Sequence, residues 1–400
     1  MWVYLSLLCL PLLWAAARAS HPHGDKLARI AIVLILAVLI GLRREVGGDW
    51  DFYLLIFRRA QAYPLVDAAA LIDPGYMMLA RLVAALGLGA GVLNLVVAAL
   101  FAAGLVLFCA RQPSPPVALF VAIPVLVVIG AMGFTRQAAA ASLVMMALAL
   151  WRPGRRLLPA ILFILAPLFH WSALIFLPLL LALFTRQPRS PWPPLLLGLA
   201  LGVLGLVTIM ANEVMAEHVA VVETSAGASL RMAPSLAALL LYLLFHERLH
   251  LSPEQEAQAG FWCGLVAFLV PLLLAFPTIA DRFNLYAVLF QMTVASHAVR
   301  LPHDARARSI AATLIAIPYI LLYTVWLNFS AYRVCWLPYR TYLGSPGDLL
   351  SSSVPERPRL SAACADVQQQ FIAVRRAPGS GRSPVQPAAS SHAENRAAPR

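Results

Sequence analysis

The sequence predicts an all-α protein: a polytopic transmembrane bundle of about 12 spans, followed by a disordered C-terminal tail. Of its 400 residues, 61% are hydrophobic and only 12% are charged, whereas about 25% of residues are charged in a typical soluble domain. A soluble fold of this length exposes a large surface to water. In a bilayer the outer surface can also be apolar, so membrane-embedded helices fit this composition.

Apolar runs that approach the length of a membrane span, about 20 residues, recur along most of the chain. They cover residues 2–17, 29–42, 92–110, 117–133, 138–151, 157–170, 171–185, 192–211, 233–246, 260–276, 283–299 and 309–329. The stretch from Leu157 to Phe184 is too long for one span, so we divide it at His170. No positively charged segment precedes the first run, which favours an uncleaved span over a signal peptide.

Two regions fall outside the predicted spans. The segment 43–91 contains an apolar stretch, 75–91, which we expect to lie at the interface or to re-enter the membrane. The last 50 residues are rich in Ser, Pro, Ala and Arg and lack a long apolar run, so they cannot bury enough surface to fold alone. We therefore predict a polytopic membrane domain at 1–342 and a disordered polar tail at 343–400.

The basic residues indicate how the bundle is oriented. The net charge is +12, and Lys26 is the only lysine among 30 basic residues. The arginines lie between apolar runs, which is typical of orientation signals, and we expect no nucleic-acid partner. One set of alternate loops is rich in arginine and is predicted to be cytoplasmic. The opposite set, which includes 43–91, 134–137 and 277–282, is then predicted to face outward.

The outward segment 43–91 departs from this rule, because it contains Arg43, Arg44, Arg58 and Arg59. Either the predicted topology is wrong, or these arginines serve a binding site. The segment also holds Asp49, Trp50 and Tyr53 near its glycines. Guanidinium groups match phosphate oxygens, and the aromatic rings either stack on a sugar or anchor the chain at the interface.

Four further outward positions carry polar or aromatic groups. They are Arg136-Gln137, His170, Asp281-Arg282 and Tyr339. Each has an ordinary explanation, namely arginine snorkelling, a polar contact at a turn, a local ion pair or interface anchoring. Their shared face favours a phosphate or pyrophosphate ligand, such as a lipid-linked pyrophosphate whose tail lies in the bilayer.

The cysteines and histidines show no metal-ligand spacing, so we predict no metal and no cofactor. Cys335 and Cys364 would form a disulfide if both face an oxidising compartment. Two free thiols are the favoured interpretation.

The order of the polar motifs resembles the EpsG family of bacterial exopolysaccharide proteins, which are similar to Wzy-type polysaccharide polymerases. The matching motifs are an arginine (Arg43 or Arg44) before Gly47-Gly48-Asp49-Trp50-Asp51-Phe52-Tyr53, then Asp73-Pro74-Gly75-Tyr76, Arg136-Gln137, Phe169-His170, Asp281-Arg282-Phe283 and Pro338-Tyr339. The resemblance covers about residues 1–342. It departs at Gly48, where many relatives are expected to have threonine.

The resemblance implies a glycosyltransferase-type polymerase in the bacterial inner membrane that joins repeat units carried on undecaprenyl pyrophosphate. It also implies membrane lipid and other polysaccharide assembly proteins as partners. Asp49 or His170 would act as the general base, with Asp281 less favoured. The substrate-binding residues would be Arg43, Arg44, Arg136, Gln137, Arg282, Trp50, Tyr53, Tyr76 and Tyr339, with the arginines on the pyrophosphate.

Three other functions remain open. A glycosyltransferase that uses a polyprenyl-phosphate sugar would also place a carboxylate in its first outward loop. A transporter or flippase of lipid-linked sugars would need polar groups at mid-span, whereas no acidic residue lies within an apolar run. A structural subunit of an assembly complex would tolerate loss of every loop arginine.

Overall fold

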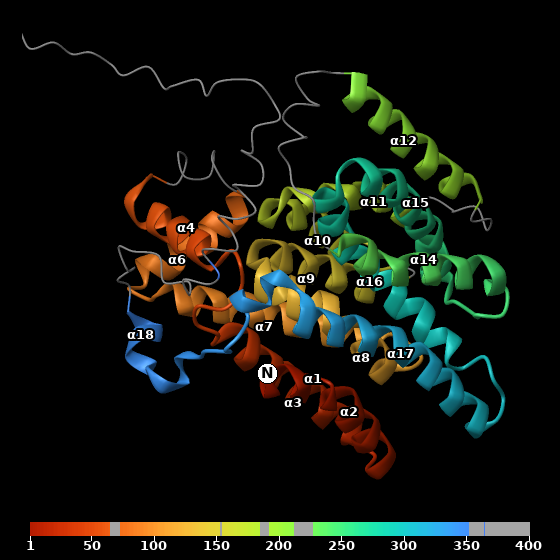
Figure 1. Cartoon of the computed structure of the whole chain (residues 1–400), viewed down its shortest axis with the longest axis horizontal. Coiled ribbons are helices and arrows are strands. Elements are labelled where there is room, and N and C mark those ends of the chain that lie inside the picture. Colours follow the sequence, from red (N-terminus) through yellow and green to blue (C-terminus); the bar gives the residue numbers. More distant parts are fainter. Residues whose placement is uncertain (65–72, 153, 185–191, 212–226, 352–363, 365–400) are drawn as a thin grey trace, which may run out of the picture.

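A computed structural model describes residues 1–64, 73–152, 154–184, 192–211, 227–351 and 364. Every regular element in these ranges is a helix (Figure 1), which confirms the predicted all-α class. The first part of the chain contains α1 (Trp2–Leu7), α2 (Cys9–Ser20), α3 (Gly24–Gly41), α4 (Trp50–Ala62), α6 (Pro74–Ala85), α7 (Ala90–Cys109), α8 (Pro115–Ala122), the π-helix η1 (Ile123–Ala131) and α9 (Thr135–Leu150).

The second part continues with helices and short 3-10 segments. They are α10 (Leu157–Phe169), η2 (Trp171–Phe176), α11 (Leu177–Phe184), α12 (Trp192–Ala211), α14 (Ala228–Phe245), α15 (Pro253–Ala275), α16 (Pro277–Ala298), α17 (Ala305–Phe329), η3 (Ala331–Cys335), η4 (Tyr342–Gly344) and α18 (Pro346–Leu350). The helices α4, α6 and α18 lie at one end of the long axis, on the left in Figure 1.

Five helical segments in the described residues are long and apolar enough to cross a membrane. They are Trp2–Ser20, α7, α14, α15 and α17. Four shorter apolar helices, including α9 and α10, lie in the predicted spans between them. These helices support a multipass membrane protein, but they do not establish the predicted number of 12 spans.

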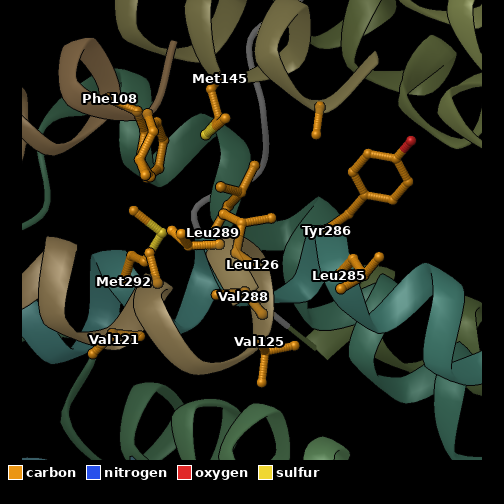
Figure 2. Close-up of a cluster of buried hydrophobic side chains, with 14 of the residues drawn as sticks. Phe108, Val121, Val125, Leu126, Met145, Leu285, Tyr286, Val288, Leu289 and Met292 are labelled. Carbon is orange, nitrogen blue, oxygen red and sulfur yellow. The ribbon is translucent and has the colours of Figure 1, made fainter. Parts of the chain in front are cut away.

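The centre of the bundle is formed by η1 and α16, with side chains from α7 and α9 around them (Figure 2). All nine residues of η1 are buried, and α16 is buried continuously from Asn284 to Ala298. Leu126 of η1 and Leu289 of α16 both lie in this core. The helix η1 and the buried part of α16 are therefore surrounded by protein, and the neighbouring helices pack against them.

The segment 43–91 contains two helices, whereas the sequence predicted only one. The expected helix over 75–91 ends at Ala85, and α4 was not predicted. Ile56 and Phe57 of α4 pack on Tyr76 and Met77 of α6 in a separate apolar cluster. The segment is thus a folded helical pair, and Trp50 to Tyr53 belong to a helix rather than to a loop.

The division of the long apolar stretch at His170 is confirmed. The residue has extended backbone between α10 and η2, with φ −162° and ψ 124°. Its Nδ1 accepts a 3.2 Å hydrogen bond from the backbone N–H of Ser172, which caps the first turn of η2. The imidazole therefore ends one helix and begins the next.

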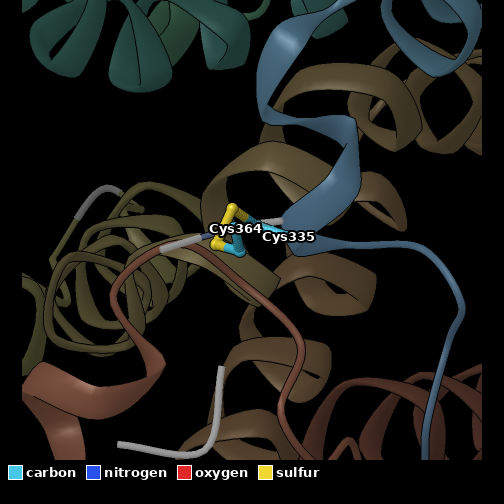
Figure 3. The surroundings of a disulfide bond; sticks show 2 residues. All are labelled: Cys335 and Cys364. Atoms are coloured by element: carbon cyan, nitrogen blue, oxygen red, sulfur yellow. A yellow bond between two sulfur atoms is a disulfide. The ribbon is translucent and has the colours of Figure 1, made fainter. Parts of the chain in front are cut away.

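The C-terminal region corrects two expectations. Cys335 and Cys364 form a disulfide (Figure 3), so the favoured interpretation of two free thiols was wrong. The start of the predicted disordered tail is folded through Leu350, and α18 packs on α7. The rest of that tail, apart from Cys364, lies outside the described residues.

Candidate functional site

One end of the bundle brings together four segments that are far apart in the sequence. Arg136, the second residue of α9, forms an ion pair of 2.8 Å with Asp73, which directly precedes α6. The Asp73 carboxylate also accepts a 3.2 Å hydrogen bond from the Trp171 backbone N–H. Gln137 donates from Nε2 to the carbonyl of Arg282 in α16, at 2.7 Å. These contacts join Asp73, Arg136-Gln137, the link at Trp171 and Arg282 at one end of the bundle.

Two guanidinium groups of this site lie over aromatic rings. The Cζ atom of Arg136 is 5.3 Å from the centroid of the Phe52 ring, and that of Arg282 is 4.8 Å from the centroid of Phe134. A ring face attracts a cation without using its hydrogen-bond donors. In the described part of the chain, no carboxylate lies within ion-pair distance of Arg282. Its N–H groups thus remain available to an anionic ligand.

Asp49 precedes the first turn of α4 and lies near both arginines. Burial raises the pKa of its carboxyl group, while the Arg282 and Arg136 guanidiniums oppose that rise. No side-chain hydrogen bond of Asp49 is formed within the described residues. A carboxylate that is desolvated and only partly compensated binds a proton more readily than an ordinary one. Asp49 is therefore suited to accept a proton from a substrate hydroxyl.

His170 is buried, and its imidazole is fixed through one nitrogen. Nδ1 lies 2.6 Å from the Ser172 hydroxyl, which is itself 2.9 Å from the hydroxyl of Tyr286. Burial, together with the nearby Arg136 and Arg282 guanidiniums, lowers the pKa of His170 to about 3. The ring is therefore neutral near pH 7 and is a weak proton acceptor. No hydrogen bond from a described residue reaches its Nε2 atom.

Unpartnered polar atoms mark the same site. In the part of the chain that the structure describes, four buried side-chain atoms lack a hydrogen-bond partner: Arg43 Nε, Tyr76 Oη, Arg136 Nε and Gln137 Oε1. All four belong to residues that the sequence predicts to bind substrate. Buried polar groups are rarely left unsatisfied, so this end of the bundle has unused capacity for hydrogen bonds with water or a ligand.

The two tyrosines of the site lie between α4, α6 and α9. The rings of Tyr53 and Tyr76 have centroids 6.1 Å apart, and both side chains are buried. The Tyr53 hydroxyl lies 3.5 Å from the backbone N–H of Arg136. Burial raises the pKa of Tyr53 to about 12, so its phenol stays protonated at neutral pH. It can therefore donate a hydrogen bond beside Arg136.

Two other predicted residues are engaged in holding the fold together. Arg43 is only 1% exposed, and it donates to the Ile40 carbonyl at 2.5 Å and to the Thr135 hydroxyl at 2.8 Å. Tyr339 donates from its hydroxyl to the Leu39 carbonyl at 2.6 Å. Arg43 thus lies under the start of α9 and fixes the residue that precedes Arg136.

Arg44 and Trp50 contact the segment that follows the last long helix. Arg44 forms an ion pair of 2.6 Å with Asp348 of α18 and lies 5.7 Å from the centroid of the Tyr342 ring. The Trp50 ring is 3% exposed, and its centroid is 6.4 Å from that of Tyr342. The structure therefore places these two side chains against the C-terminal segment, apart from the contacts that join Arg136 to Arg282.

Asp281 has a partner that the sequence did not predict. Arg231, near the start of α14, binds its carboxylate through Nε and Nη2, each at 2.8 Å. The Arg231 carbonyl accepts a 2.9 Å hydrogen bond from Asn284. A bidentate pair of this kind is geometrically fixed. Asp281 thus joins α14 to α16 next to Arg282.

Asp73 is the main residue of this site that sequence reasoning did not assign. It appeared in the motif with Tyr76 but received no role. Its carboxylate is 9% exposed and joins Arg136 to the backbone of Trp171, the residue after His170. An aspartate directly before Pro74 at a helix start is a recognisable signal. That signal predicts the helix, but it does not predict the contact with α9.

These features define a multipass helical membrane protein with a cationic, carboxylate-bearing site at one end of its bundle. The EpsG family model matches residues 26–341. The chain therefore belongs to the EpsG family, and this membership suggests a Wzy-like polysaccharide polymerase. No curated protein and no solved structure matches the chain. Among the described residues, no three His, Cys, Asp or Glu side chains gather closely enough to hold a metal ion.

Proposed function

We propose that this protein polymerises oligosaccharide repeat units carried on undecaprenyl pyrophosphate, at the outer face of the bacterial inner membrane. The observation that carries the proposal is the placement of Asp49 beside Arg136 and Arg282. This arrangement offers a proton acceptor next to two cations at the end of a helical bundle. It matches the charges that develop when a sugar leaves a pyrophosphate and joins a hydroxyl.

In the proposed reaction, a hydroxyl of the acceptor repeat unit attacks the anomeric carbon of the donor chain. The new C–O bond forms while the bond from the anomeric carbon to the pyrophosphate oxygen breaks. Negative charge builds on the departing undecaprenyl pyrophosphate, and the acceptor hydroxyl loses its proton. Fixed cations stabilise such a leaving group most strongly in the transition state.

Arg136 and Arg282 are the arginines that we propose to contact the pyrophosphate. Both are oriented by aromatic rings, which leaves N–H donors for phosphate oxygens. Arg43 and Arg44 would act on the same ligand indirectly. Arg43 holds Thr135 at the start of α9, and Arg44 holds the C-terminal segment through Asp348. Gln137, Tyr53 and Tyr76 would supply neutral hydrogen bonds. Tyr339, which donates to the Leu39 carbonyl, and Trp50, which is buried against Tyr342, would support the site without contacting the ligand.

Asp49 is the general base that we favour over His170 and Asp281. A base with a raised pKa accepts a proton more effectively near neutral pH. The lowered pKa of His170 makes its imidazole a poor acceptor, so Nε2 is better suited to a hydrogen bond with a sugar hydroxyl. Asp281 is held by Arg231 and has less freedom to accept a proton.

The transporter alternative is weakened by the polar groups of α16. Gln291 donates to the Ser235 hydroxyl at 2.7 Å and accepts from the Tyr319 hydroxyl at 3.1 Å. Ser235 is 2.6 Å from the side-chain oxygen of Asn284. These buried groups satisfy one another inside the bundle. A path for a sugar would need them to be free.

Deleting the gene in its own host and restoring it with Asp49→Asn, Arg136→Ala or Arg282→Ala tests the proposal. Arg59→Ala is the matched control, because its side chain forms no hydrogen bond or ion pair with the described residues. Glycans on the carrier and in the exported fraction are resolved by gel and mass spectrometry at equal protein level. Single repeat units on the carrier, with polymer restored only by wild type and the control, are expected.

Two other outcomes would contradict the proposal. Repeat units that stop one sugar short would indicate a glycosyltransferase that uses a polyprenyl-phosphate sugar. Polymer of normal length in the site variants would indicate that these residues are not the catalytic centre. Treatment of membranes with a chelator tests the expected independence from metal, since loss of activity that a divalent ion restores would disprove it.

A further inference from the structure

A cavity at the opposite end of the bundle combines arginines with apolar side chains. Its volume is about 560 Å³. The polar part of its wall contains four arginines, Arg111, Arg152, Arg155 and Arg156, and the apolar part includes Leu157, Leu158 and Ile161. A second cavity of about 320 Å³ shares Arg111 and Arg152 and is lined further by Gln112, Ser252, Glu254, Gln255, Gln258 and other residues.

The course of α9 and α10 places this cavity far from the proposed active site. The helix α9 begins at Thr135, beside Arg136, and ends at Leu150, which lines the cavity. Its 16 residues span about 24 Å at the rise of an α-helix. The helix α10 begins at Leu157 in the cavity and returns to His170. The cavity thus lies at the face that the positive-inside rule assigns to the cytoplasm.

The four arginines have no anionic partner in the described part of the chain. None of them forms an ion pair there, and all four are exposed. A tight turn brings three of them together, because the backbones of Arg152 and Arg155 form an antiparallel bridge around Gly154, whose φ is +74°. Four like charges around one hollow repel one another, so an anion in the cavity would relieve this repulsion.

The apolar wall continues along α10 as an exposed ridge. Leu157, Ile161 and Ile164 are 74%, 41% and 56% exposed and stand at positions i, i+4 and i+7 of the helix. Such a ridge in a membrane protein contacts acyl chains. The cavity therefore offers cations and an apolar surface directly beside them.

We propose that this cavity binds the phosphate headgroup of an anionic phospholipid, with an acyl chain along α10. Basic pockets at the cytoplasmic side of membrane helices have the chemistry to bind such headgroups. A free inorganic phosphate would use the arginines but not the apolar wall. The proposal goes beyond general attraction to an anionic leaflet, because it places one lipid molecule in a defined recess.

Native mass spectrometry of the purified full-length protein tests this proposal. Delipidated protein is titrated with phosphatidylglycerol or with phosphatidylcholine of the same acyl chains. The variant Arg111→Ala/Arg155→Ala removes two arginines of the cavity, one from the link between α7 and α8 and one from the link between α9 and α10. The control Arg248→Ala/Arg306→Ala removes the same charge from exposed positions at the same end, outside the cavity.

Wild type is expected to bind one phosphatidylglycerol in preference to phosphatidylcholine. The cavity variant should bind phosphatidylglycerol at least roughly tenfold more weakly, since each arginine near an anionic headgroup contributes to affinity. The control should stay within about twofold of wild type. Variants in which both arginines become lysine should keep most of the binding, because they retain the charge.

Three results would overturn the proposal. Equal binding of the two lipids would remove the role of headgroup charge, and equal losses in the cavity variant and the control would remove the role of the cavity. Displacement of the lipid by inorganic phosphate at similar concentration would show that the apolar wall contributes nothing. None of these readouts depends on polymerase activity, so the proposed function can fail while this inference holds.

Discussion

At the scale of single residues, burial acts on Asp49 and His170 in the same physical sense. Burial favours the neutral form of each group, so it raises the pKa of the carboxyl and lowers the pKa of the imidazole. The nearby Arg136 and Arg282 then favour the ionised carboxylate but disfavour an imidazolium. The two groups are thereby given different roles, with proton acceptance assigned to Asp49.

Asp49→Asn is expected to lower the polymerisation rate by about 100-fold or more, without destabilising the protein. The folded pKa of Asp49 lies above its unfolded value of about 3.9. Ionised Asp49 therefore lowers the stability as pH rises from the unfolded value through the folded pKa. Asparagine removes this cost, so the thermal unfolding temperature in detergent at pH 7 should be equal or higher. A large fall in that temperature would contradict the assignment.

The pH dependence of wild-type polymerisation should reflect Asp49 and not His170. If Asp49 is the base, activity falls as pH decreases through its raised pKa, above the range of an ordinary carboxyl group. His170, with a pKa of about 3, stays neutral throughout that range. The rate is measured in membranes between pH 4 and pH 8. If the fall in rate at low pH disappears in His170→Gln but remains in a partly active Asp49→Glu variant, the base would be His170 instead.

Arg136 and Asp73 form a pair whose loss should couple stability and activity. Removing either partner leaves a charge in a site where the side chains are 19% and 9% exposed, at a cost of about 2–4 kcal/mol. The double variant Arg136→Ala/Asp73→Ala should be less destabilised than the sum, with a coupling of about 1–3 kcal/mol. Unfolding in detergent measures these values. Strict additivity would show that the ion pair contributes nothing.

At the scale of elements, the loop between α3 and α4 depends on one glycine. Gly47 has φ +105°, and a Cβ there would overlap the Met132 carbonyl oxygen. Its N–H donates to the Cys335 carbonyl at 2.9 Å. The loop that carries Asp49 is therefore fixed between the end of η1 and the segment after α17.

Gly47→Ala should reduce polymerisation strongly while leaving membrane insertion intact. The strained backbone and the overlap cost about 1–3 kcal/mol, which a shift of the loop would relieve at the expense of Asp49 placement. Gly87→Ala is the control, since its φ is also positive, at +73°, but nothing lies within 4 Å of its Cβ position. Product length and protein level are measured for both. Equal activity of the two variants would show that the tight contact at Gly47 does not position the site.

Sequence reasoning predicted the elements that show as a long apolar run, or that end where a single polar residue interrupts such a run. His170 interrupts an apolar stretch, so the boundary between α10 and η2 was visible. The helix α4 was missed because Arg58 and Arg59 lie among its apolar positions. Asp73 and Arg231 could be seen as charges, but their partners come from helices far along the chain. Such pairings depend on packing, which single-sequence patterns do not encode.

At the scale of the whole molecule, the disulfide and the arginine distribution indicate the same orientation. Disulfides persist in oxidising compartments, and Cys335 adjoins the loop that carries Asp49 through the Gly47 hydrogen bond. The opposite end carries the arginine-lined cavity, and positive loops favour the cytoplasm. Both properties support the proposal that the active site lies outside the cytoplasm, where a lipid-linked chain could be extended.

Cysteine labelling in spheroplasts tests this orientation. In a protein with Cys9, Cys109 and Cys263 replaced by serine and the disulfide retained, one cysteine is introduced at Leu343 or at Arg306. Both positions are exposed, but they lie at opposite ends of the bundle. A membrane-impermeant maleimide should label position 343 in spheroplasts and position 306 only after permeabilisation. The reverse pattern would place Asp49 and the arginine site in the cytoplasm. Synthesis of polymer from an externally displayed carrier lipid would then be impossible, and a cytoplasmic substrate would be required.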